Sequence, residues 1–228
     1  MMRAFGWSEF LFILSALQWT LLLTAVALVV GGVCGLLVAL LRIQSARWMR
    51  LLSAGYIELF QGTPLLLQLF VVYFGIGLFG VNVDAWTAAA VALSAHTAAF
   101  LGEIWRGSIQ AVPRGQWEGA HALALSYGAQ LRLVILPQAV RIAIAPTVGF
   151  VVQLIKGTSV TALIGFTEIT RAGQLVNNVT LSPFIVYGVV AGLYMLLCWP
   201  ISILSRRLEK GLDRTRRSRP GKTRKQTV

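Results

Sequence analysis

The sequence predicts an all-α integral membrane protein with about five transmembrane helices. The mean hydropathy of the 228 residues is +0.74, and 57% of them are hydrophobic whereas 12% are charged. This composition lies far from that of a soluble globular domain. One membrane span needs about 20 apolar residues, so the chain has room for roughly five spans and short connections. A large soluble domain does not fit.

The predicted spans follow one another with little between them. The first, 19–41, carries no charge and is long enough to cross the hydrocarbon. The second, 54–79, is too long for one straight helix, and we expect it to be broken or kinked at Gly62, Thr63 and Pro64. The third, fourth and fifth are 84–105, 137–156 and 183–205; in the fourth, Pro137 occupies a first-turn position where proline costs no hydrogen bond.

The ends of the chain are assigned separately from this 19–205 transmembrane domain. Residues 1–18 form an N-terminal outer segment, which is either an interfacial helix or the start of the first helix. Residues 206–228 form a basic tail. We interpret the tail as a solvated, mostly disordered segment that enforces orientation, or as a segment that binds anionic lipid headgroups. The net charge of +12 therefore indicates membrane lipids, and not nucleic acid, as the partner.

Lysine and arginine predict the orientation, because short cytoplasmic loops are rich in them. Three arginines follow the first span, three more flank or occupy the loop 106–136, and ten basic residues lie within 206–225. The segment 80–84 has none, and 157–182 has only Arg171. We therefore expect the N terminus outside, the C terminus in the cytoplasm, and the loop 106–136 in the cytoplasm.

Several classes of chemistry find no support in the sequence. Cys34 and Cys198 lie in separate apolar spans, so we interpret them as buried small hydrophobic residues, without a disulfide or metal framework. No nucleophile with a base and no H-E-x-x-H motif is found. Gly221 to Thr223 imitate the end of a phosphate-binding loop, but Arg216 occupies the place of its first glycine. We expect a non-catalytic chain that binds no cofactor or metal. His96 and His121 are interpreted as packing or loop residues.

The loop between Pro113 and Pro137 interrupts the apolar chain with a polar, helix-forming sequence. Its two halves, 117–125 and 127–134, each have helical composition, and Ser126 lies where its hydroxyl caps the second helix. The first helix is rich in small residues, which let a partner approach closely, and it offers large apolar anchors. It is either a docking element or a surface hairpin that packs only on its own membrane domain.

The run EGAHALALSYGAQLRLVILP in this loop resembles the cytoplasmic EAA loop of binding-protein-dependent ABC importers. The pattern falls on Glu118, Gly119, Ala120, Ala124, Val134, Leu136 and Pro137, with Ala124 where the family has glycine. Three more runs resemble the signatures of the polar amino-acid permeases, the histidine, glutamate, glutamine, arginine and opine group. They are ELFQGTPLLLQL (58–69), GEIWRGSIQAVPRGQWEGA (102–120) and QLIKGTSV (153–160). Together the resemblance covers roughly 56–174.

This resemblance implies a type I ABC importer permease fold and the permease subunit of an ATP-driven importer of a polar amino acid in the bacterial plasma membrane. The subunit would dimerise with itself or with a similar permease, and two ABC ATPase subunits, which bind ATP and Mg, would dock on the loop 118–137. An extracytoplasmic amino-acid-binding protein would deliver the substrate. The coupling residues would be Trp117, Glu118, Gly119, Ala120, Leu123, Ala124 and Leu125. A permease for an opine or another amino-acid derivative and a carrier outside the ABC class are the alternatives.

Polar residues within the spans are the candidates for the substrate path, because ionisable groups at membrane depth tend to line a cavity or to pair. Glu103 is three residues from Arg106, a spacing that also permits a helical ion pair. Gly157 replaces an acid of the family, which disfavours a cationic amino acid as cargo. The candidates are Glu58, Gln61, Thr63, Gln68, Glu103, Gln153, Lys156, Thr158 and Ser159.

Overall fold

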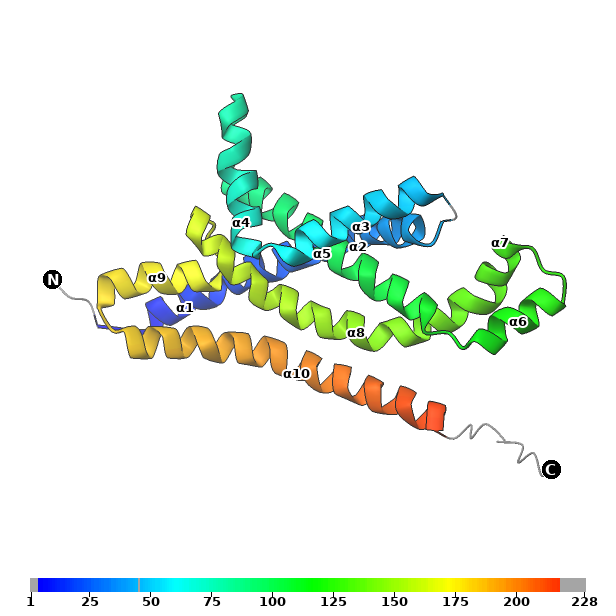
Figure 1. The fold of residues 1–228 in the computed structure, drawn as a ribbon. Coiled ribbons are helices and arrows are strands. Elements are labelled where there is room, and N and C mark those ends of the chain that lie inside the picture. The colour runs from blue at the N-terminus through cyan, green and yellow to red at the C-terminus, as the bar shows by residue number, and fades with distance from the viewer. Residues whose placement is uncertain (1–3, 45, 218–228) are drawn as a thin grey trace.

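The computed structural model describes residues 4–44 and 46–217, the last seven by their backbone alone. Within these residues the chain is helical and has no strand, which confirms the all-α class (Figure 1). The helices, in order, are α1 (Trp7–Ser15), α2 (Leu17–Arg42), α3 (Arg47–Gly62), α4 (Leu65–Phe70), η1 (Val71–Gly75), η2 (Ile76–Phe79), α5 (Ala85–Gln110), α6 (Arg114–Ala122), α7 (Tyr127–Ala129), η3 (Gln130–Ile135), α8 (Leu136–Gly157), η4 (Thr158–Ile164), α9 (Ile169–Thr180) and α10 (Pro183–Arg217).

Four helical runs among the described residues are long and apolar enough to cross a membrane, and a bent pair makes a fifth. The bent pair is α3 with the run Leu65–Phe79, and the helix axis changes direction by 106° between them. The predicted break at Gly62 to Pro64 is therefore confirmed. The predicted limit of this span, residue 54, falls inside α3, which begins at Arg47.

Both ends of the chain are more helical than the sequence suggests. Helix α1 leads into α2 through Ala16, and 7–42 qualifies as one span, so the N-terminal segment begins the first helix. Helix α10 continues to Arg217, so residues 206–217 of the predicted tail are helical and the expectation of disorder is wrong for them. Residues 218–228 lie outside the described part of the chain.

Small residues hold α2 against α5 at the centre of the bundle. Ala27, Gly31, Gly35 and Ala39 repeat every four residues on one face of α2, and all are buried. A Cβ atom added at Gly31 would lie 2.6 Å from the Ser94 carbonyl oxygen in α5. Side chains this small let two backbones approach closely, which is how helices gain contact in a membrane.

The run from α4 to η2 projects from the bundle, as Figure 1 shows. Leu69 at its base is buried in the core, whereas large apolar side chains at its far end are exposed; Leu78 and Phe79 are 88% and 86% accessible. Cys34 on α2 is exposed as well, so its interpretation as a buried residue is wrong, whereas Cys198 is buried. The exposed side chains of the projecting run and of Cys34 form apolar surface, which in a membrane protein is covered by lipid or by another protein chain.

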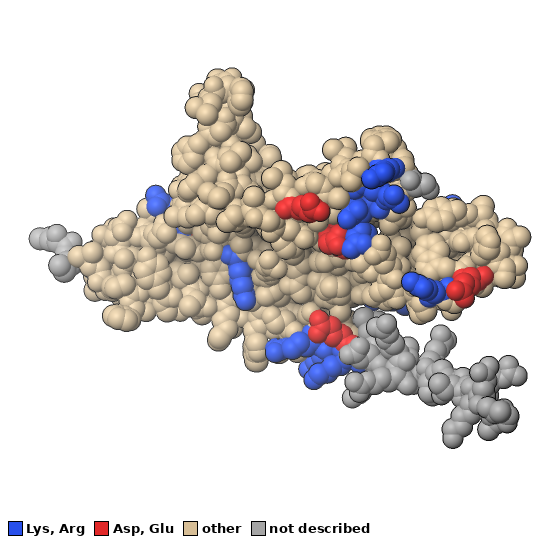
Figure 2. Space-filling view, in the orientation of Figure 1, with Lys and Arg blue, Asp and Glu red and all other residues tan. Residues whose placement is uncertain are grey.

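Charged residues gather toward one end of the bundle. In Figure 2 most of the Lys, Arg, Asp and Glu side chains lie toward the end that carries α6 and α7. Arg42 at the end of α2 and Arg50 near the start of α3 lie close to Trp117 of α6, since all three line one pocket. The loop between the third and fourth spans therefore shares its end of the molecule with the charged ends of the neighbouring helices.

Candidate functional site

Helix α6 presents the residues of the EAA-like pattern on an open surface. Glu118, Gly119 and Leu123 are exposed, and Leu123 is 75% accessible. A Cβ atom added at Gly119 would meet nothing within 4 Å. Ala120 is buried, and Trp117 packs on the cluster of Ile109, Val112, Ile135 and Ala139. One side of α6 therefore anchors it to the chain, while the other side is free to contact a partner.

A Schellman turn closes α6 at Ala124. The Leu125 N–H bonds to the Ala120 carbonyl at 3.4 Å, and the Ala124 N–H bonds to the His121 carbonyl at 2.9 Å. This turn requires a left-handed residue, usually glycine, just beyond the helix. Ala124 has φ of 54° and so adopts the left-handed conformation at a steric cost. The departure from the family's glycine leaves the turn in place but strains it.

The second short helix of the loop forms as predicted. The Ser126 hydroxyl oxygen accepts from the Ala129 N–H at 3.4 Å, which caps α7. The helix continues as a π-turn over η3, directly before Pro137, which lacks the N–H of a regular α-turn. Gln138 donates to the Gln116 side-chain oxygen at 3.0 Å and ties α8 to α6. The loop is thus mechanically linked to the fourth span.

Gln68 holds the break between α3 and α4. Its amide nitrogen lies 2.7 Å from the Phe60 carbonyl oxygen and 2.9 Å from the Thr63 carbonyl oxygen, at the end of α3. Its side-chain oxygen accepts from Nδ1 of His96 in α5 at 3.0 Å. Gln68 is buried, and its amide is therefore used within the chain. The His96 ring also packs against the tilted ring of Phe100, with the centroids 4.5 Å apart, which confirms its interpretation as a packing residue.

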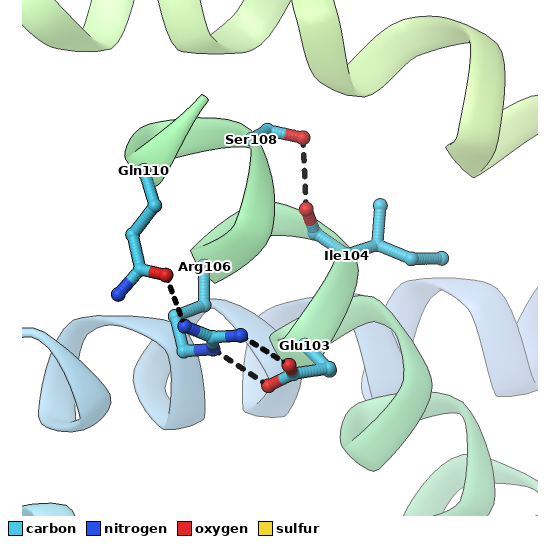
Figure 3. A network of polar contacts seen from close by, with 5 residues as sticks. All are labelled: Glu103, Ile104, Arg106, Ser108 and Gln110. Atoms are coloured by element: carbon cyan, nitrogen blue, oxygen red, sulfur yellow. Dashed lines mark hydrogen bonds and ion pairs between the residues drawn. The ribbon is translucent and has the colours of Figure 1, made fainter. Parts of the chain in front are cut away.

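Glu103 and Arg106 form the ion pair that their spacing permits (Figure 3). Arg106 Nε donates to one carboxylate oxygen at 2.7 Å, Nη2 pairs with the other, and Nη1 donates to the Gln110 side-chain oxygen. Glu103 also lines a cavity of about 320 Å³ together with Gln61, Ile142 and Pro146. The pairing interpretation of Glu103 is confirmed, and the same side chain borders an open space between α3, α5 and α8.

Of the candidate path residues at the end of α8, two have hydroxyl groups that hydrogen-bond to the backbone and two have exposed side chains. The Thr158 hydroxyl donates to the Ile155 carbonyl at 2.7 Å, and the Ser159 hydroxyl donates to the Lys156 carbonyl at 2.7 Å. Gln153 and Lys156 are exposed. A Cβ atom at Gly157 would lie 3.2 Å from Leu65 Cδ2 in α4. This end of α8 therefore lies against the start of α4, beside the break.

The structure brings some of the predicted path residues together and leaves others apart. Thr63 and Gln68 adjoin each other at the break, and the end of α8 approaches the same place through Gly157. Gln61 and Glu103 share a cavity. Glu58 lies exposed on α3. No group of three or more potential metal ligands occurs within the described residues.

A buried carboxylate at the start of α9 was not among the predicted site residues. Glu168 is fully buried and accepts from the Arg171 N–H at 2.9 Å and from the Tyr194 hydroxyl at 2.6 Å. Burial raises the pKa of Glu168 above its ordinary value, although these hydrogen bonds lower it. An acid directly before the helical run 169–180 is an N-cap signal, but its burial against α10 depends on the tertiary fold.

Comparison with known proteins identifies the family. Residues 31–214 match the family described as binding-protein-dependent transport system inner membrane component. The probable amino-acid ABC transporter permease YckA of Bacillus subtilis (strain 168) is 33% identical over 202 residues, which are 89% of each chain. The nopaline transport system permease NocM of Agrobacterium fabrum (strain C58 / ATCC 33970) is 34% identical, with 92% of each chain covered.

A solved structure has the same fold. A crystal structure described as an amino acid ABC transporter with histidines superposes with a TM-score of 0.83 at 34% identity and covers 87% of this chain and 93% of that one. The all-helical fold with its apolar spans agrees with these matches. The chain therefore belongs to the family of inner membrane components of binding-protein-dependent transport systems.

Proposed function

We propose that this chain is the transmembrane permease subunit of an ATP-driven importer that moves a polar amino acid across the cytoplasmic membrane. The observation that carries the proposal is the exposed face of α6. Glu118 and Gly119 are exposed on this face, while Ala120 on the opposite side of the same helix is buried against the chain. A loop that packed only on its own domain would bury this face. The amino-acid permease and amino-acid transporter among the similar proteins support the choice of cargo.

In this proposal α6 receives movement from two ABC ATPase subunits, which bind ATP and Mg. Glu118, Gly119, Ala122 and Leu123 form the docking face, with Trp117 and Ala120 behind them and Ala124 and Leu125 in the closing turn. The Gln138 to Gln116 hydrogen bond and the continuous backbone from α7 to α8 carry displacement of the loop into the fourth span. Rocking of the spans then alternates access between the two sides of the membrane.

The substrate path in this proposal runs between the break and the end of α8. Irregular backbone at membrane depth is tolerated beside protein or a water-filled path, and the break after Gly62 has this character. Gln61 and Glu103 border the cavity on the cytoplasmic side of the break. On the other side the accessible candidates are Gln153, Lys156 and Ser159. Thr158 is fully buried and stabilises the turn behind them. Thr63 and Gln68 shape the backbone between them, and Glu58 lies farther along α3.

A permease dimer and an extracytoplasmic binding protein complete the proposed assembly. The projecting run from α4 to η2 exposes Val71, Phe74, Leu78 and Phe79, so a second permease, identical or similar, would cover it. The arginine-rich end with α6 faces the cytoplasm under the positive-inside rule, which leaves the N terminus outside and the C terminus inside. The binding protein docks at the opposite end. The chain itself performs no catalysis in this assembly.

The test is ATP hydrolysis and uptake in vesicles that contain this chain, its ATPase and its binding protein, with polar amino acids supplied one at a time. We expect a few amino acids to stimulate both activities. Glu118→Ala should reduce the stimulation by about tenfold or more, within the range of typical coupling energies. Glu209→Ala changes an exposed acid outside the loop and should leave stimulation unchanged.

A permease for an amino-acid derivative is the second candidate, because the nopaline permease is as similar as the amino-acid permease. Derivatives such as opines therefore belong in the same panel. Stimulation by derivatives alone would select this candidate. A flat response to every compound, with assembly verified, would refute the cargo assignment, and an unchanged response in Glu118→Ala would refute the coupling role.

A further inference from the structure

A basic pocket at the α6 end of the bundle shares only Trp117 with the coupling scheme above, and its arginines have no role in that scheme. It encloses about 440 Å³ and is lined by Arg42, Arg50, Arg106, Gln110, Trp117 and Tyr127, among others. This volume lies within the range of about 300–1,000 Å³ that is usual for small-molecule sites. We call it the arginine pocket. Its walls come from four segments: the end of α2, the start of α3, the end of α5 and the loop around α6 and α7.

The charge of the arginine pocket is only partly balanced. Glu103 engages Arg106 with both carboxylate oxygens. Arg42 and Arg50 form no ion pair with a carboxylate among the described residues, and Arg42 Nε is buried without a hydrogen-bond partner there. A buried guanidinium nitrogen without a partner is costly, because its lost hydration is not replaced. The pocket is therefore short of an anionic acceptor.

Further donors surround the same space. Arg106 donates a hydrogen bond to the side-chain oxygen of Gln110, and Figure 3 shows the Gln110 amide nitrogen pointing away from Arg106. The rings of Trp117 and Tyr127 stack, with their centroids 6.4 Å apart. Planar guanidinium groups match the oxygens of a phosphate group well. Tryptophan and tyrosine favour the boundary between hydrocarbon and water, where one end of a ligand is apolar.

The position of the arginine pocket matches the headgroup layer of a membrane. Arg42 is the last residue of the span 7–42, and Gln110 is the last residue of the span 85–110. Both spans thus end at the pocket. Basic pockets between helix ends at this depth are suited to anionic lipid headgroups.

We propose that the arginine pocket binds a phosphate group, presented by an anionic phospholipid of the adjacent leaflet or by a free phosphate ester. Arg42 and Arg50 contact the phosphate oxygens, and Gln110 donates to them. Trp117 and Tyr127 pack on the glycerol portion. The bound group joins the ends of α2, α3 and α5 to the coupling loop.

The test measures retention of phosphatidylglycerol by the assembled transporter in native mass spectrometry, with phosphatidylcholine as the lipid without net charge. Arg42→Gln and Arg50→Gln should each weaken retention by about fivefold, since one basic contact to an anionic headgroup has roughly this effect. Arg50 is exposed, so its variant is expected to fold even where Arg42→Gln does not. Arg47→Gln is the matched control, because Arg47 is an exposed arginine of the same segment that does not line the pocket.

A second arm distinguishes the source of the phosphate. Inorganic phosphate and glycerol 3-phosphate are added to the transporter in phosphatidylcholine nanodiscs, and binding is measured by calorimetry. Binding in this arm with the same dependence on Arg50 supports a free phosphate ester, whereas arginine-dependent retention of phosphatidylglycerol alone supports the lipid. Equal losses in Arg47→Gln and Arg50→Gln, or no loss in either arm, would overturn the proposal. Neither arm depends on the cargo or on coupling through Glu118.

Discussion

Replacing Ala124 by glycine should stabilise the turn that ends α6. Ala124 has φ of 54°, and the two hydrogen bonds of the Schellman turn require this conformation. An L-residue with a Cβ atom pays roughly 1–2 kcal/mol in the left-handed region. Glycine avoids this cost, but it also increases the conformational entropy of the unfolded chain, which lowers the stability by about 0.4–1 kcal/mol. The midpoints of the two ranges give a net stabilisation of the turn of about 0.8 kcal/mol.

Hydrogen exchange measures this difference directly. The amides of Ala124 and Leu125 donate the two bonds of the turn, so they exchange only when it opens. In Ala124→Gly they should exchange about twofold to fivefold more slowly than in the unmodified chain at 25 °C, which follows from the net energy. The measurement uses the full chain in detergent, followed by peptide mass spectrometry over residues 119–130.

Ala122→Gly is the matched control, because Ala122 lies two residues earlier and is the last residue of α6 itself. Glycine within a helix costs about 1 kcal/mol relative to alanine, so this variant should exchange faster. If Ala124→Gly exchanged as fast as the unmodified chain, or faster, the strain assigned to Ala124 would be absent and the reasoning would fail.

Three further predictions concern packing, the break and pH. Gly31→Ala should destabilise the chain by roughly 1–3 kcal/mol, because the added Cβ atom would overpack against Ser94. The control Gly32→Ala, whose Cβ atom would lie 3.8 Å from its nearest neighbour, should not destabilise it. Thermal unfolding in detergent compares the two variants, and equal losses of stability would contradict close packing of α2 on α5. Gln68→Leu should cost about 1–3 kcal/mol, because carbonyls at the end of α3 lose their donor; an unchanged unfolding temperature would show that Gln68 does not hold the break. Burial raises the pKa of Glu168, so the folded state binds its proton more tightly than the unfolded state, and this group's contribution to stability should fall as the pH rises from about 4.5 through the raised pKa. Glu168→Gln should remove this pH dependence, and an identical pH profile for both proteins would refute it.

The helices that cross the membrane could be located from the sequence because apolar length is a local property. The predicted spans 84–105 and 137–156 lie almost wholly within α5 and α8. Their ends were harder to place. Helix α3 begins at Arg47 and α5 continues to Gln110, since polar residues extend a helix without adding hydropathy.

Parts of the candidate site were predictable for the same reason. The Glu103 to Arg106 pair follows from three-residue spacing on any helix, and Ser126 precedes a helix whose first amides need an acceptor. The partners of Gln68 were not predictable, because they depend on a 106° bend that brings Phe60 and His96 to the same side chain. The burial of Glu168 likewise required α10 to return against α9.

From the amino-acid sequence it was possible to predict that this protein is helical, crosses a membrane about five times and carries an EAA-like loop between the third and fourth spans. These properties depend on composition and on short motifs, which act over one or two helical turns. The close contact of α2 with α5 and the meeting of Arg42, Arg50 and Arg106 around one pocket are visible only in the tertiary structure. Each of these depends on residues far apart in the chain, and only packing in three dimensions brings such residues into contact.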